Sequence, residues 1–264
     1  MKEKMARILE AMHRYNSANL AYDQYRIDPD VVYDALVVAP GWKPNKIIKD
    51  PAFHVSVLAE HSYISSYLVE REGLKIAWIQ TSSGASSMID ELAITAELKY
   101  KKIVFIGAVG SLSAKHAVGD LCTPQYSIEG VMANGYLCER LSDYVPFGKV
   151  FPDEAFTSRV AEMARGCGVE VKRAPVFCTD SIALEYMHLD EIRSMGAELI
   201  EMETSSFFRM ARLLEVPAVA LMVVSDNSAA GVPLIGRDEE QQARYDRGRK
   251  EIIPELIYRI ALME

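Results

Sequence analysis

Short apolar runs recur along the chain and are separated by more polar stretches. The runs are rich in Val, Ile and Leu, and several of them end in Gly, Ser or Asp. Such runs predict buried strands that lead into loops. They span residues 31–40, 54–60, 74–84, 101–110 and 216–226.

The stretches between these runs have the spacing of amphipathic helices. Residues 86–100 mix apolar and acidic side chains at helical spacing, and residues 1–15 do the same among charges. A further helix is predicted to begin near Thr204, and the charged segment 237–251 predicts a solvated helix face. Alternating strands and helices indicate α/β architecture with a sheet covered on both faces, whose ligands gather at the carboxyl ends of the strands.

The chain has the length of one large α/β domain. Its 264 residues contain no fixed-period repeat, low-complexity tract or Gly/Ser linker that would mark a second domain. We therefore expect a single domain over residues 1–264, with residues 1–30 as an N-terminal helical extension. Residues 138–158 are irregular and are expected to form a surface excursion.

The composition of the chain argues against several classes of function. The 37 acidic and 29 basic residues, without a run of Lys or Arg longer than two, argue against nucleic-acid binding. The longest apolar run, 216–224, is far shorter than the roughly 20 residues of a membrane span, and the start lacks a signal peptide's apolar centre, so we expect a cytoplasmic protein. Scattered cysteines predict reduced thiols, and isolated histidines argue against a metal site.

A glycine turn ends the apolar run at 103–110. Gly107 and Gly110 stand three residues apart, a spacing that permits either close approach of a ligand to the backbone or tight packing of strand and loop. The third glycine of a dinucleotide fingerprint is absent, and no P-loop motif occurs. The sequence therefore gives no support to NAD or nucleoside-triphosphate binding.

Three carboxylates stand at the ends of predicted strands. Glu201 and Glu203 flank Met202 just before a helix, where they either stabilise the helix N-terminus or accept hydrogen bonds from a vicinal diol. Ser225 and Asp226 end another predicted strand, where Asp226 is either a turn residue or an acid that donates a proton. A diol-binding Glu together with an Asp that protonates a leaving base is what cleavage of an N-glycosidic bond requires.

At these motifs the chain resembles the purine nucleoside and uridine phosphorylases and the related nucleosidases. The resemblance covers about residues 31–260, with all motifs in the family's order. They are VVAPG (37–41), SSGASS (82–87), FIGAVGSLSAKHAVGDL (105–121), FCTDS (177–181), IEMET (200–204) and VVSD (223–226). The resemblance implies a single three-layer α/β/α domain around a mixed, partly barrel-like sheet. It also implies a homo-oligomer, a dimer or a hexamer, that needs no cofactor and uses phosphate as co-substrate.

The resemblance also assigns roles to individual residues. Glu203 would bind the ribose hydroxyls, with Met202 packed on the sugar and Glu201 beside them. Asp226 and Ser225 would face a purine. The phosphate side would be bordered by Gly41 and by the turn that contains Gly107, Ala108 and Gly110.

Several positions depart from the family pattern. Phe105 and Ala108 replace an Arg and a Ser or Thr that hold phosphate, which leaves Lys43 or Lys46 as the only nearby cations. Ile182 stands where an aromatic residue usually stacks on the base, with Tyr186 close to it in sequence. These losses predict that phosphate binds poorly.

The sequence therefore predicts cleavage of a purine-type nucleoside by phosphorolysis, which yields base and sugar-1-phosphate. Two alternatives stay open. One is a nucleosidase that uses water on a thioadenosine, nucleotide or futalosine-like substrate. The other is a noncatalytic nucleoside-binding or assembly protein.

Overall fold

A computed structural model describes residues 2–264, which form a single α/β domain around a mixed ten-stranded sheet. The apolar runs form most of its strands. The strands are β2 (Ala35–Pro40), β3 (His54–Glu60), β4 (Ser65–Arg71), β5 (Leu74–Thr81), β7 (Ile103–Ser111), β8 (Leu121–Glu129), β9 (Lys149–Val150), β10 (Val171–Cys178), β11 (Leu199–Glu201) and β12 (Ala218–Asn227).

One half of this sheet closes on itself. The strand order is β11-β10-β8-β12-β7-β2-β5-β4-β3, and β11 also pairs with β7. Strands β7, β12, β8, β10 and β11 therefore form a closed five-stranded barrel, from which β2 to β5 extend as an open sheet. The expected mixed, partly barrel-like sheet is confirmed.

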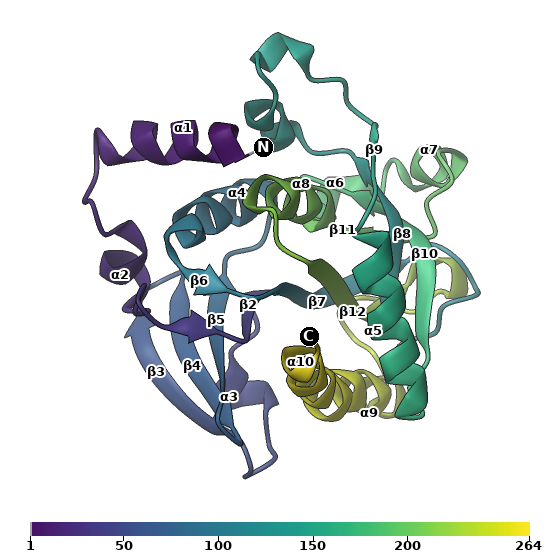
Figure 1. Cartoon of the computed structure of the whole chain (residues 1–264). Coiled ribbons are helices and arrows are strands. Elements are labelled where there is room, and N and C mark those ends of the chain that lie inside the picture. Colours follow the sequence, from purple (N-terminus) through teal and green to yellow (C-terminus); the bar gives the residue numbers. More distant parts are fainter. Residues whose placement is uncertain (1) are drawn as a thin grey trace.

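Helices cover both faces of the sheet (Figure 1). Helices α4 and α8 pack on one apolar cluster, which includes Met88 and Phe207, and α5 and α10 pack on another, which includes Phe156 and Leu256. The α-helices are α1 (Lys2–His13), α2 (Leu20–Tyr25), α3 (Pro44–Ile47), α4 (Ala85–Ile94), α5 (Glu154–Gly166), α6 (Ile182–Glu185), α7 (Leu189–Ser194), α8 (Thr204–Leu214), α9 (Glu239–Arg247) and α10 (Ile253–Leu262).

The helix expected over residues 86–100 is shorter in the structure. It ends at Ile94, a 3-10 turn follows at Thr95–Glu97, and residues Lys99–Tyr100 form strand β6. The helix does not continue because residues 99–100 pair in parallel with strand β1 (Val32–Tyr33) instead. The run at 31–40 is accordingly divided at Asp34, whose carboxylate accepts hydrogen bonds from Lys75 N and Lys101 Nζ.

The two ends of the chain lie against this core. The helix expected at the N-terminus is present as α1, while Met1 lies outside the described residues. Tyr25 of α2 is fully buried in the apolar cluster beneath α4. Residues 138–153 leave the domain surface and return through β9, which pairs with β8 (Figure 1). The last five residues of the expected excursion, 154–158, instead begin helix α5, because Phe156 packs into the core.

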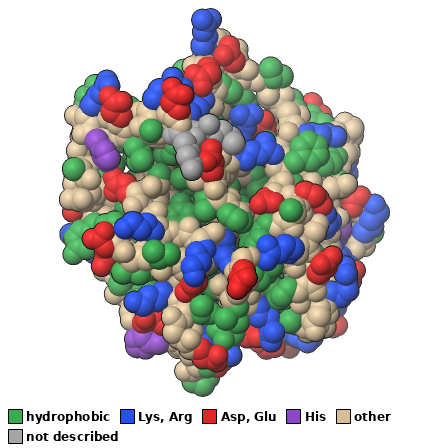
Figure 2. Space-filling model, viewed as in Figure 1, with side chains coloured by type: hydrophobic (Ala, Val, Ile, Leu, Met, Phe, Trp, Pro, Cys, Tyr) green, Lys and Arg blue, Asp and Glu red, His purple; other side chains and the backbone are tan. Residues whose placement is uncertain are grey.

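Charges of both signs are interspersed on the face shown in Figure 2, without a basic stripe. Within residues 2–264, no helix combines the length and the apolarity that crossing a membrane would need.

Gly119 joins the barrel to helix α9 in a way that only glycine permits. Its φ is +90°, and its backbone N–H donates to the Val224 carbonyl at 2.9 Å. A Cβ at this position would lie 2.8 Å from the backbone carbonyl carbon of Arg244. Any other residue at this position would therefore have a strained φ, and its side chain would clash with the backbone of α9.

We expect Gly119→Ala to lower the free energy of unfolding by about 2 kcal/mol or more. The control is Gly166→Ala on α5, where a Cβ meets nothing within 4 Å. That change should raise the stability by up to about 1 kcal/mol. Urea denaturation of both variants measures the difference, and equal stability of the two would contradict the role given to Gly119.

Candidate functional site

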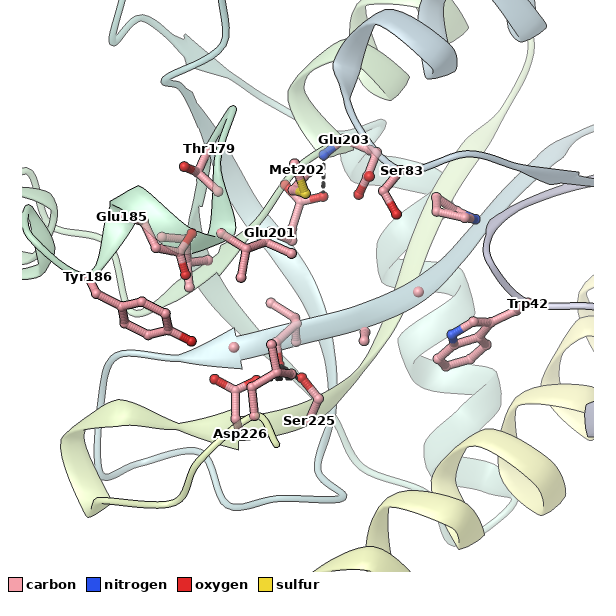
Figure 3. Close-up of a pocket in the computed structure, with 18 residues that line it drawn as sticks. Trp42, Ser83, Thr179, Glu185, Tyr186, Glu201, Met202, Glu203, Ser225 and Asp226 are labelled. Atoms are coloured by element: carbon pink, nitrogen blue, oxygen red, sulfur yellow. Dashed lines mark hydrogen bonds between the residues drawn. The ribbon is translucent and has the colours of Figure 1, made fainter. Parts of the chain in front are cut away.

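A cavity of about 150 Å3 opens at the carboxyl ends of β7, β11 and β12 (Figure 3). In Figure 3, Glu203 and Ser83 lie on one side of it and Ser225 and Asp226 on the opposite side. Its lining residues are Pro40, Trp42, Ser83, Gly107, Ala108, Val109, Gly110, Thr179, Ile182, Glu185, Tyr186, Ile200, Glu201, Met202, Glu203, Ser225, Asp226 and Leu234. The cavity lies where ligands of parallel sheets gather.

Gly110 lets the barrel close at this edge. It pairs with Ile200 of β11 on one side and with Asp226 of β12 on the other. A Cβ on Gly110 would lie 3.1 Å from both Asp226 Oδ2 and Ile200 Cγ2. The missing side chain therefore allows the strands that carry the acids to approach each other closely.

A β-bulge sets the direction of Asp226. The register of β12 against β7 shifts between Val224 and Asp226, so that Ser225 is the extra residue. A bulge re-aims the side chain that follows it. The Ser225 hydroxyl then donates to Asp226 Oδ1 at 2.6 Å, which fixes the carboxylate at the cavity wall.

Glu201 is turned away from the solvent and organises the start of α8. Its Oε2 accepts the backbone N–H groups of Glu203 and Thr204 at 2.7 and 2.8 Å. Its Oε1 accepts the Thr204 hydroxyl and the Cys178 thiol, both at 2.8 Å. Four donors thus hold one buried carboxylate, which in turn satisfies two of the free N–H groups of the helix terminus.

The side chain of Glu203 contacts the start of a second helix, α4. Its Oε1 accepts the backbone N–H of Gly84 at 2.5 Å, directly before α4. Gly84 has a φ of +105°, a conformation that favours glycine, so the SSGASS segment supplies this donor through its glycine. Glu203 therefore connects the starts of α4 and α8 on one side of the cavity.

The two glutamates differ in how well they hold a negative charge. Burial raises the pKa of both carboxyl groups, and the neighbouring Glu201 raises that of Glu203 further. Glu201 accepts four hydrogen bonds, whereas Glu203 is held by the backbone of Gly84 and Met202. The negative charge is thus better stabilised on Glu201, and Glu203 is the member of the pair that retains a proton.

A second acidic pair stands at the other end of the cavity. Burial and the nearby Asp226 carboxylate raise the pKa of Glu185, on α6, to about 7. Burial also raises the pKa of Asp226, while the Ser225 hydroxyl and the charge of Arg237 act in the opposite direction. The two like charges share a low-dielectric cavity, so the pair keeps one proton up to near-neutral pH.

The expected phosphate-side residues are divided between two cavities. Gly107, Ala108 and Gly110 line the acidic cavity. Gly41 and Lys46 instead line a neighbouring cavity of about 190 Å3, together with Lys43 and Arg249. Trp42 borders both cavities and separates them.

Lys43 and Arg249 already have acidic partners. Lys43 Nζ lies 2.8 Å from Glu60, and Arg249 donates to Asp246 at 3.0 Å. Among the described residues, no Lys, Arg or His lines the acidic cavity. The site is therefore rich in carboxyl groups and has no cationic side chain from residues 2–264.

The structure brings the sequence-predicted acids together and adds residues that the sequence did not reveal. Glu201, Met202, Glu203, Ser225, Asp226 and Ile182 all line one cavity. Glu185, Trp42 and Thr179 were not anticipated as site residues. The one available signal for Glu185 was its position near the FCTDS segment, because nothing in its spacing distinguishes it from a surface glutamate. Within the described part of the chain, no cluster of three His, Cys, Asp or Glu suits a metal ion.

Comparison with solved structures finds proteins of the same fold. Uridine phosphorylase from Vibrio fischeri is similar with a TM-score of 0.68 and 16% identity, over 89% of this chain and 92% of that one. Campylobacter jejuni 5'-methylthioadenosine/S-adenosyl homocysteine nucleosidase gives 0.66 and 15%, over 86% and 97%. The P. knowlesi homologue of P. falciparum PNP gives 0.66 and 18%, over 89% and 92%.

A search of curated protein sequences found no match. At the identities above, the structural likeness concerns the fold, so family membership rests on the sequence profile. The profile of the phosphorylase superfamily matches residues 51–253, well over half of the chain, and the protein therefore belongs to this superfamily.

Proposed function

We propose that the protein cleaves the N-glycosidic bond of a purine-type nucleoside and that water is the acceptor. The observation that carries this proposal is one cavity with a buried Glu203 on one side and the Asp226–Glu185 pair on the other. Bond cleavage leaves positive charge on the sugar and negative charge on the base. One acidic group can stabilise the positive charge on the sugar, and the other can protonate the base.

Glu203 acts at the sugar. Its carboxyl group binds the vicinal hydroxyls, and Met202 supplies an apolar wall beside the ring. As positive charge develops on the sugar, the ionised form of Glu203 becomes more favourable than it is beside a neutral nucleoside. This gain is specific to the transition state and therefore accelerates the reaction.

Asp226 acts at the base. Held by Ser225, it faces the leaving purine and donates a proton to a ring nitrogen. The Asp226–Glu185 pair keeps one proton up to a pH of about 7, and Asp226 passes this shared proton to the base. Glu201 does not touch the substrate in this proposal, because its oxygens are engaged with Glu203, Thr204 and Cys178.

Water is favoured over phosphate as the acceptor because of charge. A phosphate dianion in a partly dry site needs several donors. The described residues that line the acidic cavity include no cation, and Lys46 lies beyond Trp42. Phosphorolysis is the second candidate, supported by the backbone of residues 107–110, which lines the same cavity. These residues belong to strand β7 and do not form the turn that the sequence led us to expect.

A noncatalytic binding role fits this arrangement less well. Buried carboxyl groups with raised pKa values destabilise a fold when they ionise. Glu203 and Glu185 are both in this condition. A protein that only bound a nucleoside would have no use for two such groups at opposite ends of one cavity.

Replacing Glu203 tests the sugar end. We expect Glu203→Gln to lower kcat/KM for the nucleoside by about two decades or more, because the side chain can no longer ionise as positive charge develops in the transition state. The same change should raise the free energy of unfolding at pH 8. A carboxyl group whose pKa is raised on folding loses stability as the pH rises from its unfolded value towards the folded one.

The expected gain for Glu203→Gln is about 1 kcal/mol or more, since one pKa unit corresponds to about 1.4 kcal/mol. Steady-state kinetics and urea denaturation of the same preparation give the two values. Unchanged turnover would refute the sugar role. Unchanged stability at pH 8 would refute the buried-acid description.

Replacing Asp226 and Glu185 separates the proton donor from its partner. Asp226→Asn should lower kcat by about 100-fold or more with purine binding retained. In the wild type, activity should fall as the pH rises through about 7, where the pair loses its proton. Glu185→Gln should move this fall to lower pH, because Asp226 alone holds a proton less tightly.

The control for the charge change is Glu162→Gln on the exposed side of α5, which should leave the pH profile unaltered. The profiles are measured as kcat/KM against pH. An identical profile in Glu185→Gln would show that the two carboxyl groups do not share a proton.

Product analysis decides the acceptor. With water as acceptor, free sugar accumulates together with the base, and adding phosphate does not accelerate base release. Any residual acceleration by phosphate should disappear in Lys46→Ala. Saturable dependence on phosphate with sugar-1-phosphate as product would establish phosphorolysis and overturn the preference for water.

A further inference from the structure

A second cavity continues from the acidic site past Asp226. It has a volume of about 590 Å3 and shares Ile182, Tyr186, Asp226 and Leu234 with the first. Its remaining lining residues are Ala183, Ser228, Gly231, Val232, Pro233 and Ile235. Among the described residues, Asp226 is therefore the only charged side chain on its wall, and the rest of the wall is mainly apolar.

The loop that forms one wall is held at both ends. Asn227 and Val232 exchange two backbone hydrogen bonds of 3.0 and 2.9 Å, and the Asn227 side chain accepts the Ala230 N–H at 3.0 Å. On the far side, Arg237 donates to the carbonyl oxygens of Ser225 and Leu234 at 2.7 and 3.2 Å. The wall is thus pre-organised, which reduces the entropy that binding would otherwise lose.

Large apolar side chains on this wall face the solvent. Ile235 is 90% exposed, Tyr186 is 51% exposed and Ile182 is 43% exposed. Scattered exposed apolar residues are common, but these three line one cavity that opens into a candidate active site. An apolar ligand group that covers them would gain from their removal from water.

We propose that this cavity is a subsite for an apolar substituent on the leaving base. The substrate class is then a purine nucleoside whose base carries an apolar group on the ring edge beside the atom that Asp226 protonates. This inference rests on the proposed function, because it takes the orientation of the base from the role of Asp226.

The position of Asp226 determines which substituent fits. The sugar lies towards Glu203, at the other side of the acidic cavity, so the base points towards Asp226 and Tyr186 (Figure 3). In a purine that accepts a proton at N7, the exocyclic group at C6 is the neighbouring substituent. An apolar group on that exocyclic nitrogen passes Asp226 and enters the second cavity.

The test compares the binding of two free bases, adenine and N6-benzyladenine, by calorimetry. The wild-type protein should bind N6-benzyladenine about tenfold more tightly or better, as expected when a phenyl-sized group leaves water. Ile235→Asp should reduce this ratio severalfold. The control is Leu141→Asp, which replaces another large apolar residue, 62% exposed and outside both cavities, and should keep the wild-type ratio.

Each outcome separates this inference from the proposed function. If both bases bind with equal affinity, the subsite does not exist while the base site stands. If neither base binds, the proposed function itself fails. If Ile235→Asp alters the sedimentation coefficient of the protein, the apolar wall is a contact between copies of this chain, and the subsite proposal is overturned.

Discussion

The site depends on the close approach of three strands at Gly110. Strand β7 pairs with β12 on one side and with β11 on the other, and a Cβ on Gly110 would lie within 3.1 Å of a side chain on each of these strands. This contact closes the five-stranded barrel and brings segments that are distant in sequence to one edge. Without it, Glu203 and Asp226 would belong to separate loops.

The N-termini of two helices hold the two glutamates in place. Glu201 is bound by the start of α8, and Glu203 is bound by the N–H that precedes α4. Neither acid depends on a cationic partner, because backbone N–H groups and the helix dipoles provide the positive potential. The protein can therefore keep acids deep in a cavity without filling that cavity with arginine or lysine side chains.

The sequence predicted the parts of the fold that have a strong local pattern. Val- and Ile-rich runs identified β2, β7 and β12, and the two acids predicted at strand ends, Glu203 and Asp226, line one cavity in the structure. Strand β8 contains Pro124, and β6 has two residues, so neither has a pattern that periodicity can detect. Their conformations depend on partners elsewhere in the chain.

The same limit applies to the site. Glu185 is the last residue of the four-residue helix α6, and its pKa is raised by burial and by Asp226, which is far away in sequence. Trp42 was visible in the sequence, but its position between two cavities depends on a hydrogen bond from the Trp78 indole to its carbonyl. Such properties belong to the tertiary contacts and not to the local pattern.

The closure of the barrel also has a consequence for how the protein acquires its activity. The pairing of Gly110 with Ile200 and with Asp226 joins residues that are far apart along the chain, and such contacts form late because a long loop must close first. The open sheet of β2 to β5 also depends on the end of the chain, because Val37 and Trp78 share an apolar cluster with Leu256 of α10. The nascent chain therefore carries no assembled site until β11 and β12 have emerged, and one face of its sheet stays uncovered until α10 follows.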